Sequence, residues 1–343
     1  MSREAIAATL FGPEDLRMVA RDLGPLAAGM VRVQFGAGGI CGSDMHYFRH
    51  ARTGDFVVSS PLILGHEVAG EVVEVNGEAG GLKPGDRVAV NPSRWCGACS
   101  YCREGRENLC DNIYFMGSAS KTPHMQGGFA SLFDAVPAQC VHVPDHVSYA
   151  SAALAEPLAV SLHAVARAGD IKGKTVAVFG AGPIGLLILM AALREAPASI
   201  AMLDIAQAPL DFAASLGAER VIDLSQEGNA PDKAFDVCFE VSGTGAGLSA
   251  AIAAARRGGT VVQVGNLPGG ALPVPANAVM AKEIDLKGTF RFGQEFATAV
   301  RLIADGEIAV DRLITAERPL ADAPEAFRLA LDRSRSIKVV LTA

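Results

Sequence analysis

Four cysteines lie within fifteen residues of one another in the spacing C-x2-C-x2-C-x7-C: Cys96, Cys99, Cys102 and Cys110. This density is typical of a tetrahedral thiolate cage for one Zn²⁺. Four core cysteines or two disulfides are the alternatives, but Cys-x2-Cys pairs on one short loop favour a metal over a bridge. Because four thiolates leave no coordination position open, we expect this zinc to hold a lobe together and not to catalyse.

A second set of metal-binding residue types is divided between two short stretches, Cys41-Gly-Ser43-Asp-Met-His46 and Gly65-His66-Glu67. A cysteine, a histidine and a carboxylate are ligands of a catalytic zinc, which keeps one position open for water or substrate. Any one of them alone would be read as a core cysteine or a surface histidine. Beside the cage, the set predicts an open metal site.

A glycine-rich turn follows an apolar strand and opens an apolar helix, and it reads Gly180-Ala-Gly182-Pro183-Ile184-Gly185. A G-x-G-x-x-G run in this context indicates a dinucleotide site, because the glycines permit a tight turn and let the backbone approach a pyrophosphate at the helix N-terminus. We therefore expect a nicotinamide cofactor.

Asp204 follows Gly185 by nineteen residues, at the end of the next predicted strand. A carboxylate there accepts hydrogen bonds from the adenosine 2′-hydroxyl and repels a 2′-phosphate. The stretch from Ile205 to Pro209 has no arginine to hold a phosphate, which favours NAD over NADP. The alternative is that Asp204 only caps a helix.

The composition of the 343 residues, half of them apolar and a fifth charged, is that of a globular protein of two domains. A net charge of −7 without a basic stripe argues against nucleic acid and anionic membranes as partners. No signal peptide is visible at Met1 to Ala5, and the longest apolar run, 184–193, is too short to span a bilayer. The cysteines, mostly placed as metal thiolates, fit a reducing cytoplasm.

The elements that must position these residues fall into two classes. The first half has short alternating stretches, such as 31–35, 68–75 and 87–90, which predict a β-barrel-like region. From about Ala150, predicted strands at 175–179, 199–203, 235–241 and 260–264 alternate with predicted helices at 183–196, 209–216 and 246–256. This alternation predicts βαβ units and a parallel sheet, and 337–341 is a closing strand.

Along essentially the whole chain, the cage, the Cys41 and His66 stretches and the dinucleotide turn resemble the zinc-containing medium-chain dehydrogenases. The resemblance implies an α/β plus β fold with two domains. A GroES-like β-barrel catalytic domain with the structural-zinc lobe is expected at 1–155 and 291–343, and an inserted Rossmann NAD-binding domain at 156–290. It also implies two Zn²⁺ per chain, one catalytic and one structural, a small-molecule substrate and a homotetramer.

In that family, Cys41 and His66 match zinc ligands. The alcohol dehydrogenases take a second cysteine at the position that Glu156 occupies here. The chain thus looks like the polyol (sorbitol) dehydrogenases, in which Glu67 completes the zinc shell with a water that Glu156 holds. We assign Glu67 first and leave the choice between Glu67 and Glu156 open.

Ser43 and His46 have the spacing of the family's proton relay, although water could carry the proton instead and His46 could be an exposed loop residue. The resemblance further implies cofactor contacts at Val264, Gly265, Asn266, Thr289 and Arg291.

Tyr47 and Arg291 match polyol-contacting positions of the sorbitol dehydrogenases, and Phe292 stands where those enzymes often have tyrosine. Arg291 also offers a fork for a carboxylate. The stretches 46–56, 91–93 and 115–129 are most similar to those of the L-idonate 5-dehydrogenases, which oxidise a sugar acid. Arg49, His50 and Arg52 could help to bind an acid or form a solvated basic loop.

The resemblance therefore implies NAD-linked oxidation of a secondary hydroxyl of L-idonate, with a sorbitol- or xylitol-type polyol as the alternative. A non-catalytic binding protein of the same fold would lack one of the three zinc ligands, and all three are present. The remaining histidines, such as His124, are expected in surface loops or in a helix, and Cys140 and Cys238 are expected to be small buried side chains.

Overall fold

The computed structural model describes residues 4–343 and divides the chain into two compact units. One unit comprises the chain up to Glu156 together with Phe296–Ala343, and the other is Pro157–Glu295. The expected absence of a signal peptide concerns an N-terminus whose first three residues lie outside the described part. Within residues 4–343, no helix is both long and apolar enough to cross a membrane.

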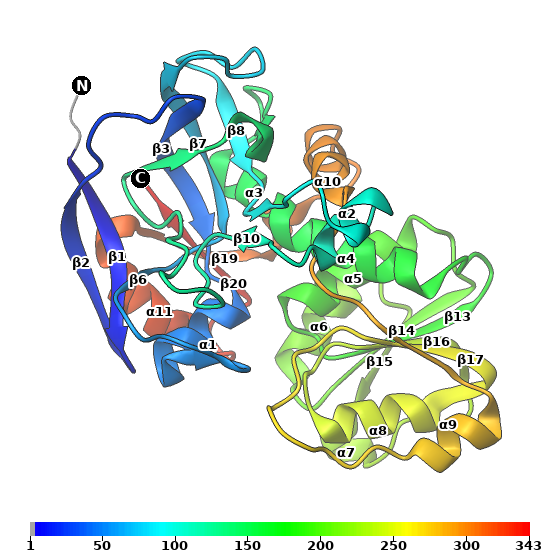
Figure 1. Ribbon diagram of the computed structural model, residues 1–343. Coiled ribbons are helices and arrows are strands. Elements are labelled where there is room, and N and C mark those ends of the chain that lie inside the picture. The colour runs from blue at the N-terminus through cyan, green and yellow to red at the C-terminus, as the bar shows by residue number, and fades with distance from the viewer. Residues whose placement is uncertain (1–3) are drawn as a thin grey trace. The chain divides into compact units, whose positions relative to one another are not determined.

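The first unit is built on two β-sheets, one with strand order β2-β1-β6 and one with order β12-β8-β7-β3-β20-β19, in which β11 also pairs with β3 (Figure 1). These strands are β1 (Glu4–Gly12), β2 (Asp15–Asp22), β3 (Met30–Gly39), β6 (Leu62–Ile63), β7 (Glu67–Asn76), β8 (Arg87–Val90), β11 (Leu132–Ala135), β12 (Cys140–His142), β19 (Ile314–Pro319) and β20 (Lys338–Thr342). The last strand β20 pairs with β3, so the two ends of the chain form one β domain.

Short hairpins and helices complete this unit. They are α1 (Gly42–His50), β4 (Arg52–Thr53), β5 (Phe56–Val57), β9 (Ser93–Arg94), α2 (Ser100–Arg103), β10 (Tyr114–Phe115), α3 (Tyr149–Ala153), α10 (Glu295–Ala304) and α11 (Ala323–Leu331). The core joins α1 to α11, because the ring of Phe327 lies 5.4 Å from that of Phe48 and 6.2 Å from that of Phe129. Aromatic packing of this kind fixes α1, which carries several of the candidate catalytic residues.

The second unit is a six-stranded parallel sheet of order β15-β14-β13-β16-β17-β18. Helices α5 and α6 cover one face, and α8 and α9 cover the other (Figure 1). The elements are α4 (Ala155–Ala168), which begins in the first unit, β13 (Thr175–Phe179), α5 (Pro183–Leu193), β14 (Ser199–Asp204), α6 (Gln207–Ser215), β15 (Arg220–Asp223), α7 (Leu224–Glu227), β16 (Phe235–Glu240), α8 (Gly245–Ala254), β17 (Ala255–Gln263), α9 (Ala276–Lys282) and β18 (Asp285–Gly288).

The expected fold is confirmed. The predicted strand Thr175–Phe179 has the predicted bounds, and the other predicted strands and helices agree to within a few residues except at β17, which begins five residues early. The alternation of apolar strand, glycine turn and apolar helix gives a doubly wound sheet because right-handed crossovers place the helices on both faces.

Candidate metal centres and dinucleotide site

The four clustered cysteines come together around the short helix α2. Their sulfur atoms all lie within 4.8 Å of one another. Sγ of Cys102 is 3.5 Å from that of Cys99 and 4.0 Å from that of Cys96. A tetrahedron with Zn–S distances of about 2.3 Å has sulfur separations of about 3.8 Å, so the four side chains fit one Zn²⁺.

Backbone amides turn toward these sulfurs. The N–H of Cys96 donates to Sγ of Cys110 over 3.3 Å, and the N–H of Asn112 donates to the same sulfur over 3.4 Å. Hydrogen bonds from the amides of Ala98 and Cys99 lower the pKa of Cys96 to about 6. Donors of this kind stabilise the thiolate form, which is the form that binds metal.

The second candidate metal group consists of Cys41, His66 and Glu67, whose ligand atoms lie within 4.8 Å of one another. Cys41 is the N-cap of α1, and Glu67 is the first residue of β7. Among residues 4–343, the group includes no fourth histidine, cysteine, aspartate or glutamate. Three protein ligands and one free coordination position are the arrangement of a catalytic zinc.

Asp44 holds the two ligand-bearing segments together. Its side chain is fully buried, and Oδ2 accepts a hydrogen bond from the N–H of Cys41 over 3.1 Å. Oδ1 accepts from the N–H of Gly65 over 3.3 Å and lies 3.5 Å from Nδ1 of His66. Sequence reasoning missed this residue, although a carboxylate three positions after an N-cap is a recognisable capping signal.

The same carboxylate makes the site suitable for a cation. Burial alone would lower the pKa of His66, but the negative charges of Asp44 and Cys41 raise it well above its usual value. Surroundings that favour a positive charge on a buried imidazole also favour a bound divalent cation. The donor set therefore fits Zn²⁺.

Lys338 is a second residue that sequence reasoning missed. Its buried ammonium lies 2.7 Å from Oε1 and 2.5 Å from Oε2 of Glu67, and it also donates to the carbonyl of Ile40 over 3.0 Å. The sequence did contain a sign of this ion pair, namely a single lysine within the apolar stretch 337–341. An isolated charge in a buried strand needs a partner of opposite charge. The ion pair restricts the Glu67 carboxylate to one orientation.

Glu156, the other candidate for the third ligand, is not a member of the three-residue group. It lies near the start of α4, 4% exposed, and burial raises its pKa to about 7, while the positive charges of His66 and Lys338 oppose that rise. The geometry favours Glu67 over Glu156 as the ligand, and the assignment stays a prediction.

The relay candidates Ser43 and His46 are both on α1. Oγ of Ser43 lies 3.5 Å from Nε2 of His66, and His46 is exposed. Tyr47, expected to contact substrate, is 3% exposed, and its hydroxyl accepts a hydrogen bond from the N–H of Ala119 over 3.1 Å. The structure thus gives Tyr47 a packing role, and its substrate contact stays a prediction.

The dinucleotide turn has the geometry that its glycines imply. Gly180 has φ of +110°, and Gly185 must be glycine because a Cβ there would lie 1.9 Å from the carbonyl oxygen of Gly180. Gly182 is the N-cap of α5, and a Cβ there would meet nothing within 4 Å. Open space before a helix N-terminus, next to a close backbone turn, fits a pyrophosphate.

Asp204 ends β14 beside this turn. Its Oδ2 accepts a hydrogen bond from the N–H of Ala181 over 2.6 Å, and Oδ1 accepts from the N–H of Ile205 over 2.7 Å. The N-cap of α6 is Ala206, so the capping alternative does not describe Asp204. The carboxylate braces the turn from the side where the resemblance places the adenosine ribose.

The remaining cofactor candidates lie at the ends of the next strands. Val264, Gly265 and Asn266 follow β17, and Thr289 follows β18 with its N–H bonded to the carbonyl of Gln263 over 3.1 Å. They share the carboxyl edge of the sheet with the glycine turn, which is where ligands of such sheets bind.

Arg291 and Phe292 follow in the same unit. Arg291 has φ of +53°, and its guanidinium lies over the ring of Phe290 at 4.8 Å. Phe292 is 2% exposed, so any contribution of its ring to substrate binding stays a prediction.

One expectation about histidines is wrong. His124 is 6% exposed instead of lying on the surface, because its Nε2 accepts from the N–H of Ser59 over 2.9 Å and its Nδ1 lies 2.9 Å from the carbonyl of Lys121. These two bonds make it a structural link between two loops.

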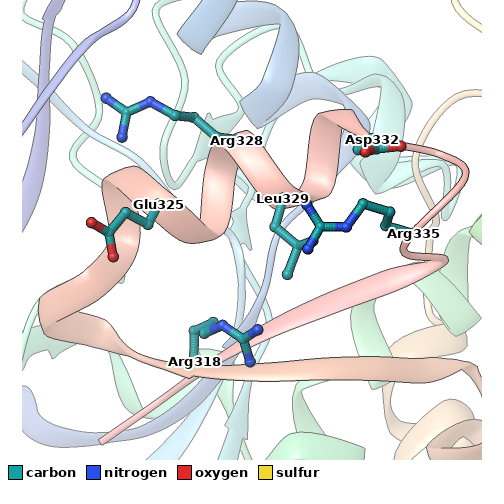
Figure 2. Close-up of a pocket in the computed structure, with 6 residues that line it drawn as sticks. All are labelled: Arg318, Glu325, Arg328, Leu329, Asp332 and Arg335. Atoms are coloured by element: carbon teal, nitrogen blue, oxygen red, sulfur yellow. The ribbon is translucent and has the colours of Figure 1, made fainter.

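A separate hollow of about 300 Å³ lies in the first unit, between β19 and α11. Figure 2 shows the side chains around it. The hollow is lined by Arg318, Glu325, Arg328, Leu329, Asp332 and Arg335. No residue of either metal group lines this hollow, so we assign it no part in the chemistry.

The comparisons with known proteins agree with this geometry. Residues 27–145 match the alcohol dehydrogenase GroES-like domain, and residues 183–305 match the zinc-binding dehydrogenase domain. L-idonate 5-dehydrogenase (NAD(P)(+)) of Escherichia coli K12 is 40% identical over 313 residues, which cover 90% of each chain. Sorbitol dehydrogenase of Bacillus subtilis 168 is 34% identical over 319 residues, 91% of this chain and 89% of the relative.

The crystal structure of the Escherichia coli L-idonate 5-dehydrogenase matches with a TM-score of 0.94 at 37% identity, covering 99% of this chain and 98% of that one. The resemblance inferred from the motifs is thereby confirmed. The chain belongs to the zinc-containing medium-chain dehydrogenase family, and it is an oxidoreductase.

Proposed function

We propose that this protein is a zinc- and NAD-dependent dehydrogenase that oxidises a secondary hydroxyl of a sugar acid, converting L-idonate to 5-dehydro-D-gluconate. The observation that carries the proposal is the group Cys41, His66 and Glu67, which offers zinc ligands and leaves one position for a substrate oxygen. With the four-cysteine cage, it would give two Zn²⁺ per chain. When bound, Zn²⁺ supplies a Lewis acid for the hydroxyl and NAD accepts the hydride.

The protein's own residues handle the proton that the hydroxyl loses. Ser43 lies next to His66, with its Oγ 3.5 Å from Nε2, and can relay the proton by accepting it on Oγ while its own hydroxyl proton passes to water. Partial desolvation of the ring, which lies near the protein surface, together with the nearby positive charges of His50, Arg333 and Arg49, lowers the pKa of His46 below its usual value. His46 is therefore neutral at pH 7 and can take the proton on toward solvent.

The substrate class is supported by the 40% identity to L-idonate 5-dehydrogenase. A polyol such as sorbitol or xylitol is the second candidate, because the sorbitol dehydrogenase of Bacillus subtilis is 34% identical. For the cofactor, Asp204 and the absence of arginine from residues 205–209 support NAD, although the name of the L-idonate relative includes both NAD and NADP.

A homotetramer and a reducing cytoplasmic location belong to the same proposal. The homotetramer is proposed from the family, and light scattering of the intact protein would test it. The cytoplasmic location is supported by the seven cysteines, none of which forms a disulfide within residues 4–343.

Arg291 is the proposed anchor for the substrate carboxylate, and its replacement tests the sugar-acid assignment. Charge-assisted hydrogen bonds contribute about 1.5–3 kcal/mol, so Arg291→Met should lower kcat/KM for L-idonate by about 10- to 150-fold. The value for sorbitol should change less than threefold. Arg49→Met, which removes a cation from the basic loop, is the matched control.

A selective loss in Arg49→Met instead would move the anchor to that loop. Equal losses for both substrates in both variants would remove the support for acid recognition.

A further inference from the structure

The order of strands in the second unit separates the part of the dinucleotide site expected to bind the adenosine from the part expected to bind the nicotinamide. Asp204 ends β14, the glycine turn follows β13, and β16, β17 and β18 continue the sheet on the far side of β13. A dinucleotide with its adenosine at Asp204 and its pyrophosphate at the turn must lay its nicotinamide half over the ends of β16 to β18.

Glu240, the last residue of β16, is fully buried at that edge. Its carboxylate accepts hydrogen bonds from the hydroxyl of Ser242, from the N–H of Gly243 over 3.1 Å and from Nε2 of Gln263 over 2.6 Å. Neither the pyrophosphate turn nor a metal group includes this residue. Burying a carboxylate costs free energy unless its oxygens accept hydrogen bonds. The three donors around Glu240 therefore indicate that this carboxylate has a specific role.

Two donors lie in loop 242–244, which packs against the dinucleotide turn, and the third, Gln263, ends β17 just before loop 264–266, which packs against loop 242–244. A Cβ on Gly180 would lie 2.9 Å from the amide nitrogen of Ser242, and one on Gly265 would lie 2.3 Å from that of Gly243. A Cβ on Gly243 would lie 2.7 Å from the carbonyl oxygen of Asn266. The backbones of the two loops therefore approach closely at Gly243 and Gly265, where a side chain on either residue would clash.

Gln263 connects Glu240 to the second loop. Its Nε2 donates both to Glu240 and to the carbonyl of Gly265, the latter over 2.8 Å. Because both partners are acceptors, the orientation of the amide is fixed by chemistry. Its Oε1 and the hydroxyl of Thr289 are buried without a hydrogen-bond partner among residues 4–343, so both are available to a bound molecule.

We infer that Glu240 is a positioning residue for the nicotinamide half of the cofactor. Through Gln263 it holds loops 242–244 and 264–266 in the conformation that receives this half, and it presents the amide oxygen of Gln263 at the site. The inference rests on the proposed NAD-dependent function and names the residues that shape one half of its cofactor site.

The test compares two ligands that differ in that half. ADP-ribose has the adenosine, the pyrophosphate and the second ribose of NADH but lacks the nicotinamide. Glu240→Gln replaces one acceptor oxygen of the carboxylate with an NH2 group, which is a donor. In either orientation of the amide, this NH2 group faces another hydrogen-bond donor, so the loops must rearrange. Calorimetric titration should show the Kd for NADH raised at least tenfold and the Kd for ADP-ribose raised less than threefold.

Gln263→Met removes the amide at nearly constant volume and should give the same pattern, which keeps the test decisive if Glu240→Gln does not fold. Asp236→Asn is the matched control, because Asp236 lies at the opposite end of the same strand, where its carboxylate bonds to Thr175. It should lower the melting temperature and leave both Kd values within twofold of wild type.

A variant that weakens both ligands by the same factor, or neither, overturns the inference and leaves Glu240 a structural residue. A wild-type protein that binds neither NADH nor NADPH overturns the proposed function itself. The two failures are therefore distinguishable.

Discussion

At the scale of single residues, the two metal groups differ in how completely the protein surrounds the ion. The cage offers four sulfurs, whereas the group of Cys41, His66 and Glu67 offers three ligand atoms. We expect Cys41→Ser to abolish turnover and leave a folded protein with one zinc fewer. Cys99→Ser should also lose one zinc, but with aggregation or loss of the lobe around α2, because none of the residues of α2 is buried and the metal must hold it in place.

Metal content by plasma mass spectrometry, circular dichroism and NADH formation measure these outcomes on the same samples. If both variants stayed soluble and active, the division into a catalytic and a structural zinc would be wrong.

Asp204 is the residue that should set the choice of cofactor. Asp204→Asn keeps an oxygen that can accept from the N–H of Ala181 but removes the charge that repels a 2′-phosphate. The ratio of kcat/KM for NAD to that for NADP should fall about tenfold or more. Asp204→Ala, which also loses the brace on the turn, should raise the KM for NAD further. An unchanged ratio in Asp204→Asn would mean that Asp204 only supports the turn.

At the scale of secondary-structure elements, Asp236 joins the starts of β13 and β16. Its carboxylate accepts from the N–H of Thr175 over 2.8 Å and from its hydroxyl over 2.7 Å, and it pairs with Arg256 at 2.5 Å. Burial opposes ionisation, but these donors prevail and lower the pKa of Asp236 to about 2. The carboxylate therefore stabilises the folded unit wherever it is charged.

Because the pKa of Asp236 is lower in the folded protein, its contribution is complete above the unfolded value near 4 and is lost as the pH falls toward 2. A shift of this size corresponds to about 2 kcal/mol at pH 7, of which about half should be lost by pH 3. Urea titrations of wild type and Asp236→Asn at pH 7, 5 and 3 measure the difference. A difference that stays constant over this range would contradict the assignment.

The separation of interacting residues along the sequence explains which parts of the site the sequence could predict. The strand β13 and the glycine turn are adjacent in sequence, so a local pattern reveals both. The partners of Asp44 and Lys338 lie 21 residues away at Gly65 and 271 residues away at Glu67, so only the folded chain reveals them. The network of Glu240 and Gln263 likewise depends on the pairing of β16 with β17.

At the scale of the whole molecule, the chain combines a β domain that carries both metal groups with a parallel sheet that carries the dinucleotide turn. Zinc ligands alone would fit a hydrolase and a glycine turn alone would fit many nucleotide-binding proteins, so their combination in one chain carries the assignment to a zinc dehydrogenase. In the proposed function the substrate is set by a few side chains such as Arg291, which explains why the family could be inferred from motifs and the substrate only proposed.

The most direct test of the proposed activity is NADH formation, followed at 340 nm with NAD and, side by side, L-idonate, D-gluconate, sorbitol and xylitol. Rapid turnover of L-idonate, at least tenfold above the polyols in kcat/KM and abolished in Cys41→Ser, is the predicted result. Faster oxidation of sorbitol or xylitol than of L-idonate would contradict it and would place the protein with the neutral polyol dehydrogenases.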